Sequence, residues 1–323
     1  RKSFFAISNT YPIFEETLDY KNSIKKEGKC FCTIFTPTYN RKDLIVNLYE
    51  SLKLQTNKDF EWLVIDDGST DDTDLLFKQL LNIKNDFAIK YIKIENGGKQ
   101  KAVNKALQIA NGQMFFIVDS DDIITSTAIN DIYNAEKMIH NIEGFAGVSG
   151  LKGYSKTDPI GKKMRRPFID CTNNNRFKYN LLNDKAEVYY TDLLRRYPFP
   201  EIENEKFISE SVVWDKIGGD NYKIRWFNKI IYLCDYLDGG LTKTGLKLYQ
   251  NNPEGFAIFI NNLRRFNSLR IKNLMANCFG YYDKYKDTKK IDEISDELGV
   301  YKIEMQLIIL LKKMYSMVMK RKK

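Results

Sequence analysis

The feature that most limits how this chain can fold is an alternation of short apolar runs and helix-like segments in its first third. Four runs rich in β-branched and aromatic side chains lie at residues 31–36, 61–65, 89–94 and 114–118. Between them, apolar residues recur every three or four positions, as on one face of an amphipathic helix. The runs start about thirty residues apart, the length of a βαβ unit. The pattern predicts an α/β fold with a mostly parallel central sheet and helices on both faces.

Polar clusters follow three of these four runs, at residues 66–70, 95–98 and 119–122. In open parallel sheets, ligands bind in the crevice at the carboxyl ends of the strands, so we expect the clusters to converge there. No GxGxxG motif follows the first run and no GxxxxGK[ST] motif occurs, which argues against a dinucleotide oxidoreductase and a P-loop NTPase. His140 is the one histidine, so catalysis is expected to depend on carboxylates.

Composition limits the class of protein and its partners. Of the 323 residues, 43% are apolar and 29% charged, as in globular proteins. The 51 lysines and arginines exceed the 42 acidic residues and give a net charge of +9, which suits an anionic partner. The five cysteines form no CxxC pair, which favours a reducing, cytoplasmic compartment. No apolar run approaches the ~20 residues that span a bilayer, so no membrane-spanning helix is expected, and residues 1–29 do not show the charged-then-apolar pattern expected of a signal peptide.

The sequence Asp119-Ser120-Asp121 is the most informative polar cluster. Two carboxylates one residue apart at a strand end can share a divalent ion, and such oxygen ligands suit Mg²⁺ or Mn²⁺. The alternative is a simple turn or helix cap, for which Asp and Ser are also favoured. Asp66 and Asp67 also have two interpretations. They could simply form a turn, or one of their carboxylates could accept hydrogen bonds from a base or ribose.

Four segments in this order resemble the family 2 inverting glycosyltransferases with a GT-A fold. They are residues 36–41 (TPTYNR), 64–71 (VIDDGSTD), 96–104 (NGGKQKAVN) and 118–122 (VDSDD). Residues 185–188, 197–200 and 205–214 are similar to one branch of that family, typically bacterial enzymes of surface-polysaccharide assembly. The resemblance implies a nucleotide-sugar donor, with UDP favoured, a divalent metal, inversion at the anomeric carbon, and a hydroxyl acceptor on a glycan or a lipid-linked glycan.

The resemblance also implies roles for individual residues. Those expected at the donor are Pro37, Tyr39, Asp66, Asp67, Lys99, Asn104, Asp119 and Ser120. Among them, Pro37 and Tyr39 would line the nucleoside pocket, and Asp67, beside Asp66, would meet the uracil or ribose. Asp121 would bind Mn²⁺ or Mg²⁺ on the diphosphate, with Asp119 as a second ligand.

Glu210 lies where the family carries its catalytic base, and Glu205 is the competing candidate. Ser209-Glu210 replaces the more common Glu-Asp pair at this place. Farther along, a glycine-rich loop with Thr242 and Lys243 is interpreted either as a cradle for the diphosphate or as a surface turn.

The predicted organisation has three parts. Residues 1–29 form an N-terminal extension, 30–260 a GT-A domain, and 261–323 a helical C-terminal extension. The domain divides into a nucleotide-sugar-binding half (30–125) and an acceptor and catalytic half (126–260). In the extension, a helical stripe consists of Ile303, Leu307, Leu311, Met314 and Val318. It indicates core packing or an oligomer contact, or, with the basic end at 320–323, peripheral contact with the inner face of the cell membrane.

Two other functions fit some of these features. A nucleotidyltransferase also uses strand-end aspartates and a metal. A non-catalytic protein that binds nucleotides or an anionic polymer would use the basic charge. Because the aromatic residues are scattered and the crevice is acidic, no nucleic-acid partner is predicted.

Overall fold

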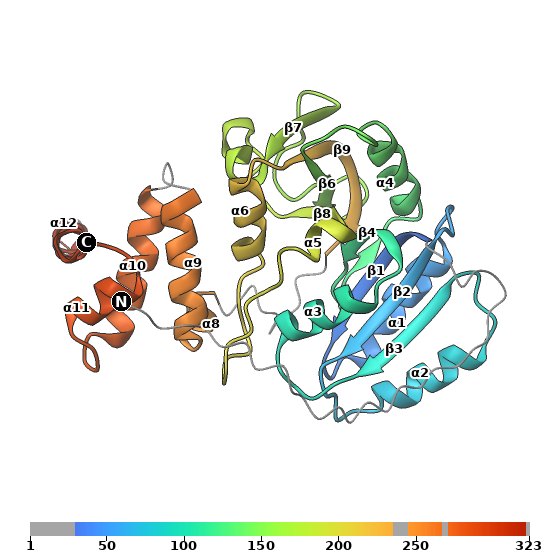
Figure 1. The fold of residues 1–323 in the computed structure, drawn as a ribbon, viewed down its shortest axis with the longest axis horizontal. Coiled ribbons are helices and arrows are strands. Elements are labelled where there is room, and N and C mark those ends of the chain that lie inside the picture. Colours follow the sequence, from blue (N-terminus) through green and yellow to red (C-terminus); the bar gives the residue numbers. More distant parts are fainter. Residues whose placement is uncertain (1–29, 235–244, 267–270, 321–323) are drawn as a thin grey trace.

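The computed structural model describes residues 30–234, 245–266 and 271–320, and the side chains only as far as residue 314. A nine-stranded mixed sheet forms its centre (Figure 1). The strands are β1 (Cys30–Thr38), β2 (Phe60–Asp66), β3 (Ala88–Lys93), β4 (Gly112–Ile117), β5 (Ile123–Ile124), β6 (Phe145–Gly153), β7 (Phe168–Thr172), β8 (Lys185–Tyr190) and β9 (Lys223–Leu233). Their order is β3-β2-β1-β4-β8-β6-β9-β5, with β7 paired to β9.

Helices surround the sheet and continue beyond it toward the C-terminus. They are α1 (Lys42–Lys53), α2 (Thr73–Asn82), α3 (Lys99–Ile109), α4 (Ala128–Lys137), the 3₁₀ helix η1 (Asn173–Tyr179), α5 (Thr191–Leu194), α6 (Ser211–Gly219), α8 (Leu246–Gln250), α9 (Pro253–Phe266), α10 (Ile271–Tyr285), α11 (Ile291–Glu297) and α12 (Lys302–Lys320). The predicted α/β class is therefore confirmed, and the four apolar runs are β1 to β4.

The first four strands form the parallel half of the sheet, in which β1 pairs with β2 and β4, and β2 pairs with β3. Every residue of β2 is buried, as expected of a strand covered on both faces. Gly112 begins β4 where a Cβ would lie 2.1 Å from the Thr33 backbone nitrogen, so only glycine fits this approach. Two apolar clusters lie on opposite faces of the sheet. One includes residues of α1, α2 and α4, and the other includes residues of α3, α5 and α6.

The second half of the sheet is mixed. β8 is antiparallel to both β4 and β6, whereas β6 and β9 are parallel, and β5 and β7 are antiparallel to β9. β9 thereby reaches back to the segment that follows β4. This return brings its last residues, including Tyr232, beside the acidic cluster at 119–122.

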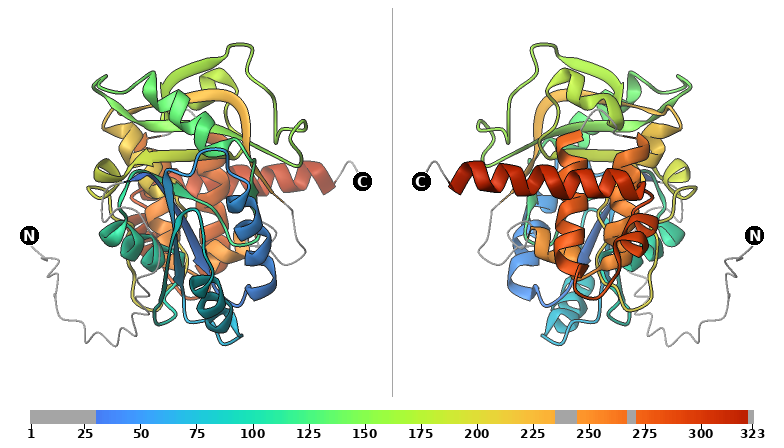
Figure 2. Two further views of the ribbon diagram at one scale, coloured as in Figure 1. Left: turned by 90° about the vertical axis from the view of Figure 1, so that its right-hand side faces the viewer. Right: turned by 90° about the vertical axis from the view of Figure 1, so that its left-hand side faces the viewer.

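The C-terminal helices form a third apolar cluster, which includes Phe256, Ile260, Tyr281 and Met305. α9 joins this cluster to the sheet domain because it packs on α6. The predicted boundary at residue 260 lies within α9, and the division into parts stays a prediction. α12 crosses the outer side of the other C-terminal helices, and its C-terminal end extends past them (Figure 2). Within the ranges that the structure describes, no helix is both long and apolar enough to span a membrane.

Candidate active site

The candidate site is built at the carboxyl ends of β1, β2 and β4 and at the start of α3. β1 and β2 end level with each other, since Thr38 pairs with Asp66. At this end Asp66 is fully buried and both of its carboxylate oxygens are used. Oδ1 accepts the Ser69 backbone N–H (2.7 Å) and Oδ2 accepts the Tyr91 hydroxyl (2.5 Å). Asp66 therefore shapes the turn after β2, and its oxygens have protein partners.

Asp67 orders the loop that precedes α3. Its two carboxylate oxygens accept the backbone N–H groups of Gly97 (2.7 Å) and Gly98 (2.8 Å). Burial raises the pKa of Asp67, and these two amides oppose that rise. Gly98 has φ +92°, and a Cβ there would lie 2.3 Å from the Lys206 carbonyl oxygen. The loop is thus fitted closely between Asp67 and the segment around residue 206.

Lys99, the first residue of α3, joins two of the predicted site residues. Its Nζ lies 2.6 Å from Asp119 Oδ1 and 2.8 Å from Glu210 Oε1. Glu210 Oε1 makes no well-aligned hydrogen bond to the residues described, so its contact with Lys99 is an ion pair. Three segments far apart in sequence meet at this ammonium group.

The charged groups in this cluster shift one another's pKa values. Burial acts to lower the pKa of Lys99, but Asp119 and Glu210 outweigh it and raise that pKa above its ordinary value. Burial acts to raise the pKa of Asp119, but Lys99 and Lys152 outweigh it and lower that pKa. Lys99 and Asp119 are therefore both charged at neutral pH.

Asp121 is held less closely than Asp119, whose carboxylate lies 2.6 Å from Lys99. A quarter of its side chain is exposed, and its ion-pair partner, Arg41, lies 3.9 Å away. Magnesium-type sites commonly use one or two protein carboxylates plus phosphate oxygens. Nowhere in the described ranges do three or more His, Cys, Asp or Glu side chains gather in a metal-binding group. The residues present therefore fit an ion shared with a diphosphate, held by Asp121 with Asp119 beside it.

Three further side chains at this cluster were missed by the sequence analysis. The Asp119 backbone N–H donates to Tyr232 Oη (3.0 Å), and the Tyr232 hydroxyl donates to Asp122 Oδ2 (2.7 Å). Lys152 Nζ lies 4.2 Å from the centre of the Tyr232 ring. Burial raises the pKa of Asp122 to about 6. No local motif marks Tyr232 or Lys152, because β9 and β6 bring them to the site from far along the chain.

Glu205 lies away from this cluster and caps a helix. Its two carboxylate oxygens accept the backbone N–H groups of Glu254 (2.7 Å) and Gly255 (2.8 Å) in the first turn of α9. The Glu205 carbonyl accepts the Gln100 side-chain amide of α3 (2.9 Å). The segment that leads to Glu210 is thereby fastened to both α9 and α3.

The remaining predicted residues are placed as follows. Asn104 bonds through both of its side-chain atoms to the Phe199 backbone (2.9 Å each), so it ties α3 to that loop. Tyr39 directly follows β1 and is 48% exposed. Pro37 is half-buried at the end of β1, and Ser120 is buried. The loop with Thr242 and Lys243 lies outside the described residues.

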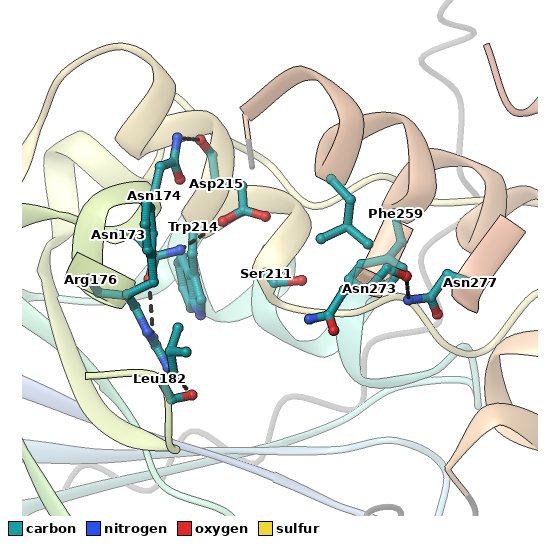
Figure 3. A pocket seen from close by; sticks show the side chains of 12 residues that line it. Asn173, Asn174, Arg176, Leu182, Ser211, Trp214, Asp215, Phe259, Asn273 and Asn277 are labelled. Atoms are coloured by element: carbon teal, nitrogen blue, oxygen red, sulfur yellow. Dashed lines mark hydrogen bonds between the residues drawn. The ribbon is translucent and has the colours of Figure 1, made fainter. Parts of the chain in front are cut away.

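A pocket of about 260 Å³ lies between η1, α6, α9 and α10 (Figure 3). Its lining includes Ser211 and Asp215 of α6, and the other wall includes Asn273 and Asn277 of α10. Asp215 accepts the Asn173 side-chain amide (2.8 Å), so part of the polar lining is already bonded. Lys99, Asp119 and Glu210 are not among the lining residues, although Ser211 directly follows Glu210 in the chain.

Relatives of known sequence share parts of this chain. A GalNAc(5)-diNAcBac-PP-undecaprenol beta-1,3-glucosyltransferase from Campylobacter jejuni is 26% identical over 260 residues, which cover 77% of this chain and 80% of that protein. The Staphylococcus aureus poly(ribitol-phosphate) beta-N-acetylglucosaminyltransferase TarS is 35% identical over 165 residues, 50% of this chain and 28% of TarS. An uncharacterized glycosyltransferase from Rickettsia felis is 35% identical over 120 residues, but the match covers only 19% of that protein.

Solved structures confirm the predicted GT-A type of fold. TarS residues 1–349 in complex with UDP-GlcNAc superpose with a TM-score of 0.58 at 22% identity, covering 83% of this chain and 78% of that one. The mannosyltransferase PcManGT from Pyrobaculum calidifontis, in complex with GDP-Man and Mn²⁺, gives 0.55 at 19% identity and covers 88% and 86%. The model of glycosyl transferase family 2 matches residues 33–194, half of the chain. As the sequence motifs predicted, the chain belongs to glycosyl transferase family 2.

Proposed function

We propose that this protein is an inverting glycosyltransferase of bacterial surface-polysaccharide synthesis. It moves a sugar from a nucleotide-sugar, with UDP as the favoured nucleotide, to a hydroxyl of a glycan or a lipid-linked glycan. The observation that carries the proposal is the carboxylate of Glu210, held by Lys99 beside Asp119 at the strand ends of a family 2 fold. All five cysteines are unpaired, which supports a reducing, cytoplasmic location.

The groups gathered at the strand ends suit a nucleoside diphosphate. The Asp67 loop and the exposed Tyr39 ring border the end where a base and ribose would lie. Lys99 offers an ammonium group to the diphosphate. The TarS structure contains UDP-GlcNAc and the PcManGT structure contains GDP-Man. Proteins with this fold therefore bind sugars carried on uridine diphosphate and on guanosine diphosphate. UDP is preferred here because of the motif resemblance and the TarS match.

Glu210 is proposed as the general base. An inverting transfer needs one carboxylate to accept the proton of the acceptor hydroxyl while that oxygen attacks the anomeric carbon. The bond to the nucleoside diphosphate breaks as the new glycosidic bond forms on the opposite face of the sugar. Lys99 orients the Glu210 carboxylate at 2.8 Å, and Glu205 has both oxygens committed to α9. This difference supports Glu210 over Glu205.

Mn²⁺ or Mg²⁺ is proposed as the cofactor, held by Asp121 with Asp119 as a second ligand. When bound, such an ion neutralises the negative charge that develops on the leaving diphosphate. The Mn²⁺ in the PcManGT complex supports a divalent ion in this fold. Lys99 would supply a second, fixed positive charge beside the leaving diphosphate, next to Asp119. The Tyr232 hydroxyl accepts the Asp119 backbone N–H and so holds that residue in place.

The substitution Glu210→Gln tests the base. It removes a proton acceptor and nearly preserves shape, so donor binding should persist while donor turnover falls by about 100-fold or more. Donor binding is followed by thermal stabilisation, and turnover by release of nucleoside diphosphate with and without candidate glycan acceptors. The exposed Glu203 in the same loop provides the control variant Glu203→Gln, which should turn over normally. Normal turnover by Glu210→Gln would refute this assignment.

A further inference from the structure

Helix α12 carries apolar side chains on two opposite faces. The inner face consists of Met305, Ile308 and Ile309, which are 0%, 8% and 8% exposed and belong to the third apolar cluster. These side chains pack the helix on α10 and α11. An ordinary surface helix would be polar on its other side.

The outer face of α12 is apolar as well. Its members share a helical spacing of three or four residues, and they are Ile303 (74% exposed), Leu307 (55%), Leu310 (54%), Leu311 (41%) and Met314 (50%). We call these five residues the outer stripe. α12 lies across the outside of the C-terminal helices (Figure 2), so no other described element covers this side. A continuous exposed apolar surface of this kind usually marks an interaction site.

The charges around the outer stripe point to an anionic partner. No acidic residue occurs from residue 305 to the end of the chain. The same stretch contains six basic residues, Lys312, Lys313 and residues 320–323, of which the last three lie outside the described residues. Lys312 is turned inward over the Phe279 ring of α10 (5.5 Å), so Lys313 and Lys320 are the lysines available beside the outer stripe along the described part of α12. Glu304, the one acidic residue of α12, is paired with Arg264 at 3.0 Å.

We propose that the outer stripe docks on an anionic lipid surface, with α12 lying in the plane of the membrane. The apolar side chains would enter the boundary between headgroups and acyl chains, while the long lysine side chains reach the phosphates. The α12 of a second copy of this chain is equally basic, so it offers these lysines no opposite charge. The proposal concerns a surface distant from the charged cluster and does not depend on the reaction.

Flotation of the full-length protein with lipid vesicles tests the surface. The protein should float with vesicles of mixed phosphatidylcholine and phosphatidylglycerol, and stay unbound with phosphatidylcholine alone. The double variant Leu307→Ser, Leu310→Ser should partition about tenfold less, because two half-exposed apolar side chains are lost. Leu75 of α2, which is 49% exposed, provides the control, and Leu75→Ser should partition as the wild type does.

A charge variant tests the same surface independently of the apolar stripe. Lys313→Gln with Lys320→Gln should lower partition onto anionic vesicles by about fivefold for each lysine, and added salt should weaken wild-type binding. Far-UV circular dichroism and thermal melting establish that each variant is folded. Failure of the folded wild type to bind anionic vesicles overturns the proposal. The proposal is also overturned if the wild-type protein binds no vesicles but forms a dimer that the double leucine variant dissociates. That result would assign the outer stripe to contact with a second copy of the chain.

Discussion

At the scale of single residues, the arrangement of the site depends on one lysine that pairs with two carboxylates. Lys99 contacts both Asp119 and Glu210, and without its charge these two carboxylates would repel each other. The sequence motif predicted Lys99 near the donor and Glu210 as the base, but it did not predict their contact. That contact requires the 99 and 210 segments to meet, which depends on how the loop after β8 folds back over α3.

Replacing Lys99 by Met should weaken donor binding without unfolding the protein. The side chain keeps its length and loses the ammonium group that bonds to Asp119 and that we propose meets the diphosphate. Because hydrogen bonds to charged groups contribute about 1.5–3 kcal/mol, we expect donor affinity to fall by about 10- to 100-fold. Isothermal titration calorimetry with the donor measures the change. Lys105→Met, on the same helix, is the control, and equal losses in both variants would contradict a specific role for Lys99.

Lys185 provides a test of pH dependence at the same scale. It is 3% exposed, and burial followed by repulsion from Arg176 lowers the pKa of Lys185 to about 8. Below pH 8 the lysine is charged in both states, and its burial destabilises the fold. Between about pH 8 and 10.5 the folded state releases its proton before the unfolded state does, so this residue makes the free energy of unfolding rise with pH.

Lys185→Met should therefore stabilise the protein at pH 7 by about 1–2 kcal/mol, after allowance for two lost bonds to backbone carbonyls. Its advantage over the wild type should shrink as the pH rises from 8 to 10. Urea unfolding at several pH values measures both effects. The exposed Lys162 serves as control, since Lys162→Met should show no such dependence. A constant difference at all pH values would contradict the predicted titration.

At the scale of elements, the first four strands and their helices could be predicted because each has a local signal. Each apolar run ends in a polar turn and is followed by a helical stripe. The mixed half of the sheet could not be predicted in this way, because the pairing of β9 with β6, β7 and β5 joins residues far apart in the chain. For the same reason, the sequence alone left both Glu210 and Glu205 as candidates for the base. The partner of Glu205 is the start of α9, about fifty residues later.

The helix cap predicts a loss of stability from Glu205→Gln. Glutamine keeps one acceptor oxygen and replaces the other with a donor, so one of the two bonds to the α9 backbone is lost. We expect the free energy of unfolding to fall by about 1–2 kcal/mol, as for lost helix caps. Chemical denaturation measures it, with Glu203→Gln as the matched control. If Glu205→Gln is as stable as the wild type and yet inactive, Glu205 regains its claim to be the base.

At the scale of the whole molecule, a ligand that bridges the two halves of the sheet domain should stabilise the entire fold. The candidate site combines groups from the end of β2, the start of α3 and the segment after β4 with Glu210, which directly precedes α6. A nucleotide-sugar bound here would contact both halves. Binding to the folded state raises stability by mass action, and no knowledge of the acceptor is needed to observe it.

With a UDP-sugar at about 100 times its dissociation constant, the stabilisation is about 2.7 kcal/mol, or a rise in Tm of about 5 °C. The rise should require Mn²⁺ or Mg²⁺ and vanish in EDTA. Asp121→Ala should remove the metal-dependent part, because Asp121 faces the site with Arg41 only at 3.9 Å. Asp158→Ala, in an exposed loop, should leave the shift unchanged. If Tm rises equally for Asp121→Ala and the wild type, the assignment of the metal to Asp121 is wrong. If Tm rises with nucleoside triphosphates alone, nucleotidyl transfer is favoured over sugar transfer.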